Sequence, residues 1–334
     1  MAKGNFNYTL LTAKRRLSKG NDIIPGLARI SKDEAALQRI EKLSKASATR
    51  IDAINVAPPA IDGKRTNPFV LAAHARKSKL KSPFDLDLGL AAAKEFSGLE
   101  TALGRIVEDL VPQIYGWEQV HSKAHSVLTE IDSAKKIGDT IRLAALKSGP
   151  ACMNDTMVNK IGGAVAEHYV AWAEHWSVST IEFTVGMNYS TGRNSNKKDW
   201  HAVRLAEEQL YASGATIIDS CIGNRSELRP LSKPGFIAEA QGIQIKMHVR
   251  QGIDFWGYIA DPVKDAYLEI CCALAKSAAP KASFNSPGEL RTEQLLNVAS
   301  NPNQFSVPYG SPISNEQLPW LFLFVRHFVD ELTP

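Results

Sequence analysis

Two short apolar runs, residues 126–132 and 141–147, stand on either side of a polar stretch, residues 133–139, that has a glycine near its end. Short apolar runs separated by a polar, glycine-containing segment are typical of two strands joined in a hairpin. The pattern therefore predicts a β-hairpin whose strands coincide with the apolar runs and whose turn lies in the polar stretch.

Acidic and basic side chains alternate with apolar ones along these predicted strands. Since alternate side chains of a strand share a face, Glu130 and Asp132 are expected together on the first strand, and Lys147 at the end of an apolar face on the second. If the two faces lie on the same side of the sheet, two carboxylates and one ammonium group converge. Carboxylate oxygens are ligands for Mg²⁺, and a lysine can stabilise phosphate oxygens. The simpler alternative is a solvated ion-pair cluster on an open face.

Helical periodicity surrounds the hairpin. A 3.6-residue apolar period predicts an amphipathic helix that ends near residue 53 and has Ser31 as its expected cap. The same signal predicts helices over residues 85–116, 154–176, 199–212, 254–276 and 314–332, and further strands are predicted over residues 179–185, 215–222 and 236–249. Helices before, between and after strands predict an α/β fold: a mixed β-sheet flanked by helices, with a helical, basic N-terminal region.

The composition agrees with a globular chain. At 334 residues, with 44% apolar and 22% charged residues, the sequence can bury a full core. No stretch approaches the roughly 20 apolar residues that span a bilayer, and the N-terminal segment lacks the apolar run of a signal peptide. The four cysteines have no metal-ligand spacing, which favours buried thiols. We therefore expect a cytoplasmic protein.

Positive charge is concentrated at the start of the chain. Residues 1–81 contain seventeen Lys and Arg against six Asp and Glu, although the whole chain has a net charge of only +4. A basic segment on an acidic body is typical of polyanion binding, and a solubilising surface is the alternative. Loops near residues 188–198 and 223–233 add Arg, Asn and Lys, which contact bases and phosphates; ordinary flexible loops would look the same. The candidate DNA-binding residues are Lys14, Arg15, Arg16, Arg76, Lys77, Arg193, Asn194, Asn196, Lys197, Lys198, Arg225 and Arg229.

Several short phrases then follow one another along the chain. An acid on one strand is followed by a strand that ends in Lys147, and Leu-Lys-Ser-Gly-Pro occupies residues 146–150 with Asn154 shortly after it. Gly-Asn-Arg occupies residues 223–225, and Gly-Ile-Asp-Phe-Trp occupies residues 252–256. In order and spacing these phrases resemble type II restriction endonucleases of the PD-(D/E)xK nuclease superfamily.

The resemblance implies a sequence-specific double-stranded DNA endonuclease that hydrolyses phosphodiesters with Mg²⁺ and acts as a homodimer. Asp132 and the backbone carbonyl near Leu146 would hold the metal, Glu130 or Glu108 on the preceding helix would complete its ligands, and Lys147 would complete the catalytic set. One position departs from the pattern, because the family usually has an acid or a glutamine where this chain has Ala145.

The chain is expected to divide into a basic, helical DNA-binding region, residues 1–85, and a catalytic domain, residues 86–334. Glu118 and Glu167 are further acids that could replace the missing one. Because Ala145 stands where an acid is expected, a non-catalytic nucleic-acid-binding or packaging protein is an alternative. A structure-specific repair nuclease is a third possibility.

Overall fold

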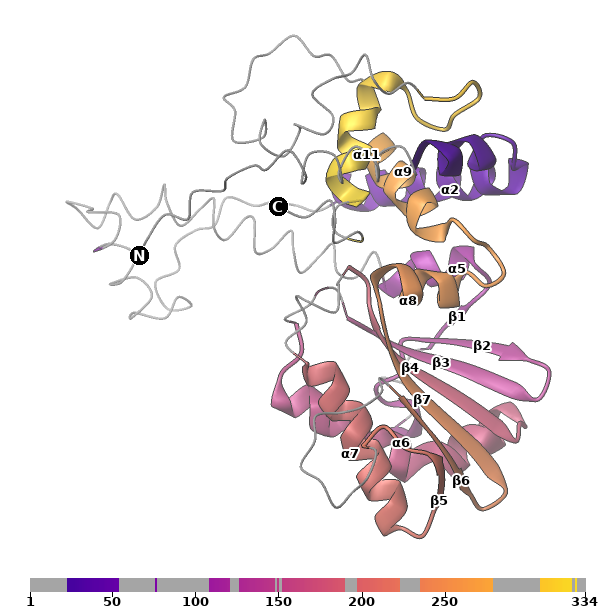
Figure 1. Ribbon diagram of the computed structural model, residues 1–334, viewed down its shortest axis with the longest axis vertical. Helices are drawn as coiled ribbons and strands as arrows, with labels where there is room; N and C mark the ends of the chain where they lie inside the picture. The colour runs from indigo at the N-terminus through magenta and orange to yellow at the C-terminus, as the bar shows by residue number, and fades with distance from the viewer. Residues whose placement is uncertain are drawn as a thin grey trace.

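The computed structural model describes residues 23–53, 76, 108–120, 126–147, 149, 152–189, 197–222, 235–278, 307–325 and 328. Within them, one seven-stranded sheet has the order β1-β2-β3-β4-β7-β6-β5 (Figure 1). Its strands are β1 (Glu118–Gln119), β2 (Ser133–Ile137), β3 (Thr140–Lys147), β4 (Thr180–Met187), β5 (Thr216–Asp219), β6 (Gly235–Ala240) and β7 (Ile243–Gln251). The β3–β4 and β4–β7 pairs are parallel and the other pairs are antiparallel. The predicted α/β fold with a mixed sheet flanked by helices is confirmed.

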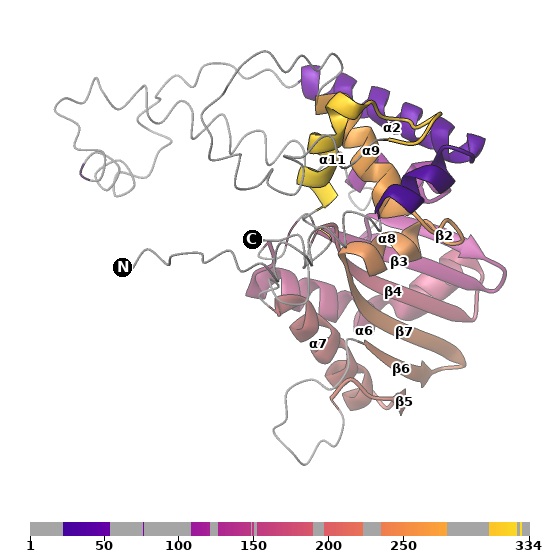
Figure 2. The same ribbon diagram turned by 45° about the horizontal axis from the view of Figure 1, so that its top comes forward.

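Helices cover both sides of this sheet. The helices include α2 (Glu34–Asp52), α5 (Val111–Ile114), η3 (Ser126–Leu128), α6 (Asp155–Trp176), α7 (Lys198–Ala212), α8 (Gly252–Ile259), α9 (Ala266–Ala278), η4 (Asn315–Gln317) and α11 (Leu318–Val325), and residues 23–30 are also helical. Figures 1 and 2 show α6 and α7 on one side of the strands, with α8 and the group formed by α2, α9 and α11 on the other.

The alternation along β3 connects two cores. Ile141, Leu143 and Ala145 are buried on the side of α6 and α7, whereas Ala144 and Leu146 belong to the core around α8. A strand with apolar side chains on both faces is expected in the middle of a sheet covered by helices. Lys147 therefore follows the row of side chains that faces α6, at the carboxyl end of the strand.

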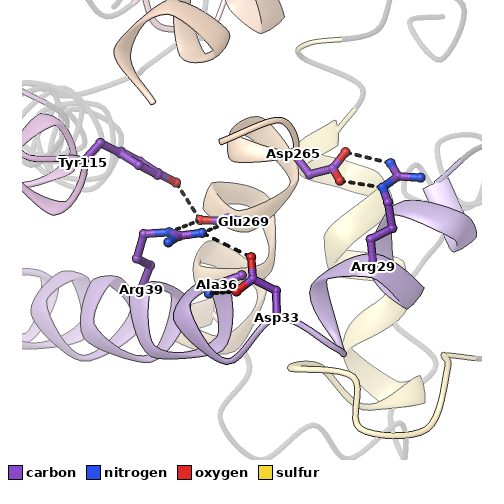
Figure 3. A network of polar contacts seen from close by, with 7 residues as sticks. All are labelled: Arg29, Asp33, Ala36, Arg39, Tyr115, Asp265 and Glu269. Carbon is purple, nitrogen blue, oxygen red and sulfur yellow. Dashed lines mark hydrogen bonds and ion pairs between the residues drawn. The ribbon is translucent and has the colours of Figure 1, made fainter. Parts of the chain in front are cut away.

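The group of α2, α9 and α11 is held partly by buried polar contacts. Both carboxylate oxygens of Glu269 on α9 accept hydrogen bonds from Arg39 on α2, at 2.7 and 2.9 Å, and one also accepts from the Tyr115 hydroxyl at 3.0 Å (Figure 3).

α2 begins later than expected. The side chain that caps it is that of Asp33, which accepts from the Ala36 N–H, and not that of Ser31.

The hairpin is confirmed but its first strand is displaced from the predicted position. Residues 126–128 form η3, β2 lies in the polar stretch that was expected to be the turn, and the turn itself contains Gly138 at a φ of 58°. The lysines of β2 reach carbonyl groups: Lys135 Nζ donates to Tyr115 O at 3.0 Å, and Lys136 Nζ donates to Trp176 O at 2.6 Å. A polar strand is stable here because other segments satisfy its side chains.

Candidate active site

Asp132 is fixed immediately before β2 by three hydrogen bonds to its neighbours. Its N–H donates to Ala144 O at 2.9 Å, its carbonyl accepts from the Val120 N–H at 3.0 Å, and its carboxylate Oδ2 accepts from the Leu146 N–H at 2.6 Å. The last residues of β3 therefore position the main chain and the side chain of Asp132, and Val120, which follows β1, adds a third hydrogen bond to its carbonyl. A backbone N–H aimed at a carboxylate is a charge-assisted hydrogen bond that orients it firmly.

Lys147 ends β3 beside this carboxylate. Its Nζ lies 3.8 Å from Asp132 Oδ2, and its side chain is 19% exposed against 31% for Asp132. The carbonyl of Lys147 accepts from the Asn188 N–H at 2.9 Å, which connects the end of β3 to the end of β4. The two side chains that the sequence singled out are therefore neighbours, although Asp132 precedes its strand and does not lie within it.

Burial changes the pKa of Asp132. Loss of solvent raises the pKa of this carboxyl above its usual value, and the charge of Asp109 raises it further. Lys147 and the Leu146 N–H act in the opposite direction without cancelling the effect of burial. A carboxylate with a raised pKa gains from an added positive charge, and such groups concentrate at functional sites.

Asp109 is the second acid of this region, and sequence reasoning chose its neighbour Glu108 instead. Asp109 Oδ1 accepts from Gln119 Nε2 at 2.9 Å, and Oδ2 accepts from Arg50 Nη1 at 3.2 Å. Its side chain is 27% exposed. Glu108, partly buried, lies in the same helical turn. The sequence shows two adjacent acids, Glu108 and Asp109, before β1. Their adjacency alone does not tell which of them acts on Asp132.

Glu130 belongs to a different surface. It has a φ of 62°, and it lines a cavity of about 360 Å³ together with Glu167 and His168 of α6. Asp132 is not among the residues that line this cavity. The expectation that Glu130 and Asp132 share a strand face was wrong in its premise, because residues 129–132 are not in a strand. Glu118, on β1, is exposed.

The donor set at Asp132 fits one kind of metal better than others. Within the described part of the chain, no group of three or more His, Cys, Asp or Glu is arranged to hold a metal ion. This does not suit a closed structural site such as that of zinc. Mg²⁺ is usually held by one or two carboxylates and keeps waters and substrate phosphates as its other ligands, so a site with the Asp132 carboxylate, and with the charge of Asp109 acting on it, fits Mg²⁺ better than zinc.

An acidic metal ligand at position 145 would destabilise the fold. Ala145 is 1% exposed and belongs to the core between the sheet and α6. An acid there would place a charge among apolar side chains, which is unfavourable unless it is paired. The alanine at this position is therefore explained by packing, and Asp109 is the described acid whose charge acts on Asp132.

Two features beyond the acids shape the end of β3. Gly149 is buried, and a Cβ on it would lie 2.7 Å from the Tyr189 hydroxyl, so only glycine fits without displacement of that side chain. Asn188 is 2% exposed, and neither polar atom of its side-chain amide has a hydrogen-bond partner among the residues that the structure describes. An unsatisfied buried amide is costly and uncommon. Sequence reasoning did not identify Asn188, because its burial depends on tertiary packing.

The structure describes three of the candidate DNA-binding residues. Arg76 is exposed. Lys198 pairs with Asp155, and Lys197 Nζ lies 5.2 Å from the centre of the Trp200 ring. Both lysines therefore have protein partners near the start of α7. The remaining candidates lie outside the described residues: Lys14, Arg15, Arg16, Lys77, Arg193, Asn194, Asn196, Arg225 and Arg229.

No protein-family model matches the chain, and no curated protein is similar enough to count as a relative. Among the described helices, none combines the length and apolarity needed to cross a membrane.

Proposed function

We propose that the protein is a Mg²⁺-dependent endonuclease that hydrolyses double-stranded DNA, with the sequence specificity of a type II restriction enzyme. The observation that carries the proposal is the 3.8 Å approach of Lys147 Nζ to Asp132 Oδ2 at the carboxyl end of β3. A second carboxylate, Asp109, is near enough to influence the pKa of Asp132. The basic start of the chain and the order of short phrases along it support DNA as the substrate.

Each side chain has a distinct task in this proposal. Asp132 and Asp109 would hold the cation, and the Leu146 N–H keeps the Asp132 carboxylate oriented. When bound, the cation would activate water and neutralise charge on the phosphate. Lys147, as a point charge, would stabilise the phosphate oxygens as negative charge grows on them. The partly buried setting of Lys147 and Asp132 strengthens such electrostatic effects.

The partners follow from the same proposal. A palindromic DNA site has a two-fold axis, so a symmetric homodimer would match it. The basic residues of the N-terminal region would contact phosphates, and the polar loops would contact bases. DNA as the substrate is consistent with a cytoplasmic location.

The test is plasmid cleavage. Wild-type protein incubated with supercoiled plasmid and Mg²⁺ is expected to give discrete fragments, and Asp132→Ala is expected to give none while it still binds the plasmid in a gel-shift assay. Asp265→Ala is the matched control, since Asp265 also pairs with a basic side chain, that of Arg29, and not with Lys147. Retained cleavage by Asp132→Ala would contradict the proposal.

One observation favours a second candidate, a non-catalytic nucleic-acid-binding protein. Ala145 stands where related nucleases usually have an acid, and it is buried in the core. A protein of this class would bind plasmid equally as wild type and as Asp132→Ala, without cleavage in either case. Fragments with no fixed ends would instead indicate a nuclease specific for DNA structure, and sequencing the ends of the fragments distinguishes it from a restriction enzyme.

A further inference from the structure

Arg50 joins the helical group to the candidate active site. It lies in the last turn of α2, and its Nη1 donates to Asp109 Oδ2 at 3.2 Å. α2 itself is held against α9 by the buried contacts of Arg39 with Glu269 and by the ion pair of Glu41 with Lys276 at 2.6 Å. The position of Arg50 beside Asp109 is therefore set by the packing of two helices and not by its own side chain alone.

Two basic and two acidic side chains lie near one another in this region. Arg50 pairs with Asp109, and Asp132 pairs with Lys147. The end of β1 connects the two pairs, because Gln119 donates to Asp109 Oδ1 at 2.9 Å and the N–H of the next residue, Val120, donates to Asp132 O at 3.0 Å. Two cations thus stand at the outer ends of two carboxylates, and the four charges cancel. A divalent cation held by the carboxylates would leave two positive charges in excess, and the phosphodiesters of DNA are the anions that would balance them.

The chemistry of Arg50 suits this role. A guanidinium has five N–H donors in a planar fork that matches phosphate oxygens, and the hydrogen bond to Asp109 uses one terminal nitrogen. The Arg50 side chain is 45% exposed, so solvent and a ligand can reach it. This inference rests on the proposed nuclease function: we propose that Arg50 binds a phosphate of the DNA next to the cleavage site and that Asp109 positions its guanidinium.

The experiment measures binding without cleavage. The full-length protein and its variants are titrated against a fluorescein-labelled random-sequence duplex in a chelating buffer, and the dissociation constant is followed over a range of salt concentrations. Each lost phosphate contact lowers the slope of log affinity against log salt by about one. Arg50→Gln is therefore expected to bind more weakly and with a slope smaller by about one, and Arg50→Lys is expected to restore most of the slope.

Two further variants separate a phosphate contact from a structural role. Asp109→Asn removes the negative charge of the ion pair but keeps a side-chain oxygen that can accept from Arg50, so the guanidinium stays in position and the variant is expected to bind at least as tightly as wild type under metal-free conditions. Arg204→Gln is the matched control: its side chain is also 45% exposed, and it pairs with Glu208 at 2.8 Å on α7. Its slope is expected to equal that of wild type. If Arg50→Gln keeps the wild-type slope, or if Asp109→Asn weakens binding as much as Arg50→Gln does, the proposal is wrong.

Cleavage of plasmid by wild type, measured in parallel, distinguishes this inference from the function on which it rests. Cleavage together with an unchanged slope for Arg50→Gln would overturn the role of Arg50 and leave the nuclease in place. A reduced slope with no cleavage would overturn the nuclease and leave Arg50 as a phosphate contact. A wild-type protein that neither binds nor cleaves DNA would overturn both.

Discussion

Two clusters of charged residues in this protein are built in opposite ways. At Glu269, both carboxylate oxygens accept hydrogen bonds from Arg39, Tyr115 adds a third, and the Glu269 side chain is only 3% exposed (Figure 3). At Asp132, the lysine stands 3.8 Å away, beyond hydrogen-bonding distance, and the side chain is 31% exposed. The first cluster is closed and fully paired, whereas the second is more exposed and, among the described residues, has fewer close partners.

The difference indicates what each cluster is for. Hydrogen bonding to Glu269 raises the pKa of Arg39, and burial, followed by the charge of Glu269, raises the pKa of Tyr115. Both shifts favour the protonated forms of Arg39 and Tyr115, which are the forms that donate hydrogen bonds to Glu269. Burial without sufficient compensation raises the pKa of Asp132, which favours the approach of a cation. Satisfied buried networks specify a fold, whereas poorly satisfied ones occur at sites that bind something.

The largest effect on stability is expected at the closed cluster. Arg39→Ala leaves the Glu269 carboxylate buried without its cation, and breaking a buried ion pair on one side typically costs about 3–5 kcal/mol. Urea denaturation followed by far-ultraviolet circular dichroism measures the loss. Arg29→Ala is the control, because Arg29 makes the same two-pronged contact with Asp265 but is 62% exposed. Equal losses in the two variants would contradict the comparison.

An acid placed at Ala145 tests the packing explanation. Ala145→Glu puts a carboxylate among the apolar side chains between β3 and α6, so the free energy of unfolding is expected to fall by about 3 kcal/mol or more. Ala145→Leu controls for volume alone. If Ala145→Glu folds normally and cleaves DNA faster than wild type, then this position does face the site.

A smaller effect is expected at the open cluster. Asp132→Asn removes a carboxylate whose pKa is raised by folding, so the free energy of unfolding is expected to change by less than about 1 kcal/mol. A raised pKa in the folded state means that the ionised carboxyl destabilises the fold, so this contribution to stability is present at low pH and is lost as the pH rises through the folded pKa. Thermal denaturation at several pH values is expected to show a weaker dependence in Asp132→Asn than in wild type over that range.

The smallest effect on stability is expected at His248 of β7. Burial, followed by the charge of Arg250, lowers its pKa below 6.5, while Glu182 and Asp254 act in the opposite direction and Lys246 lowers it slightly. The unfolded chain therefore binds the proton first as the pH falls, and stability is lost below the ordinary histidine pKa. Thermal denaturation at two pH values is expected to show that His248→Gln loses less stability on acidification than wild type does. Identical losses would mean that His248 does not contribute.

Strong local patterns made part of this molecule predictable. The buried run of β3 and the capped helix α6, whose N-cap Asn154 accepts from the Met157 N–H, lie where the sequence indicated. β2 was misplaced because its lysines are stabilised by carbonyls of distant segments, which no local pattern reveals. Asp109 was missed for a similar reason, since its relation to Asp132 and to Arg50, 59 residues away, exists only in the folded chain.

The claim that the Asp132–Lys147 pair is catalytic is tested most directly by one comparison of cleavage rates. Plasmid cleavage with Mg²⁺ is measured for wild type, for Lys147→Ala and for Lys276→Ala, which removes a lysine of similar exposure from the ion pair with Glu41. Loss of one transition-state contact lowers the rate by about 100-fold or more, so Lys147→Ala is expected to cleave at least that much more slowly at an unchanged melting temperature, while Lys276→Ala cleaves as wild type does. Equal cleavage by wild type and Lys147→Ala, or a folded wild type that binds DNA and leaves it intact, would contradict the account.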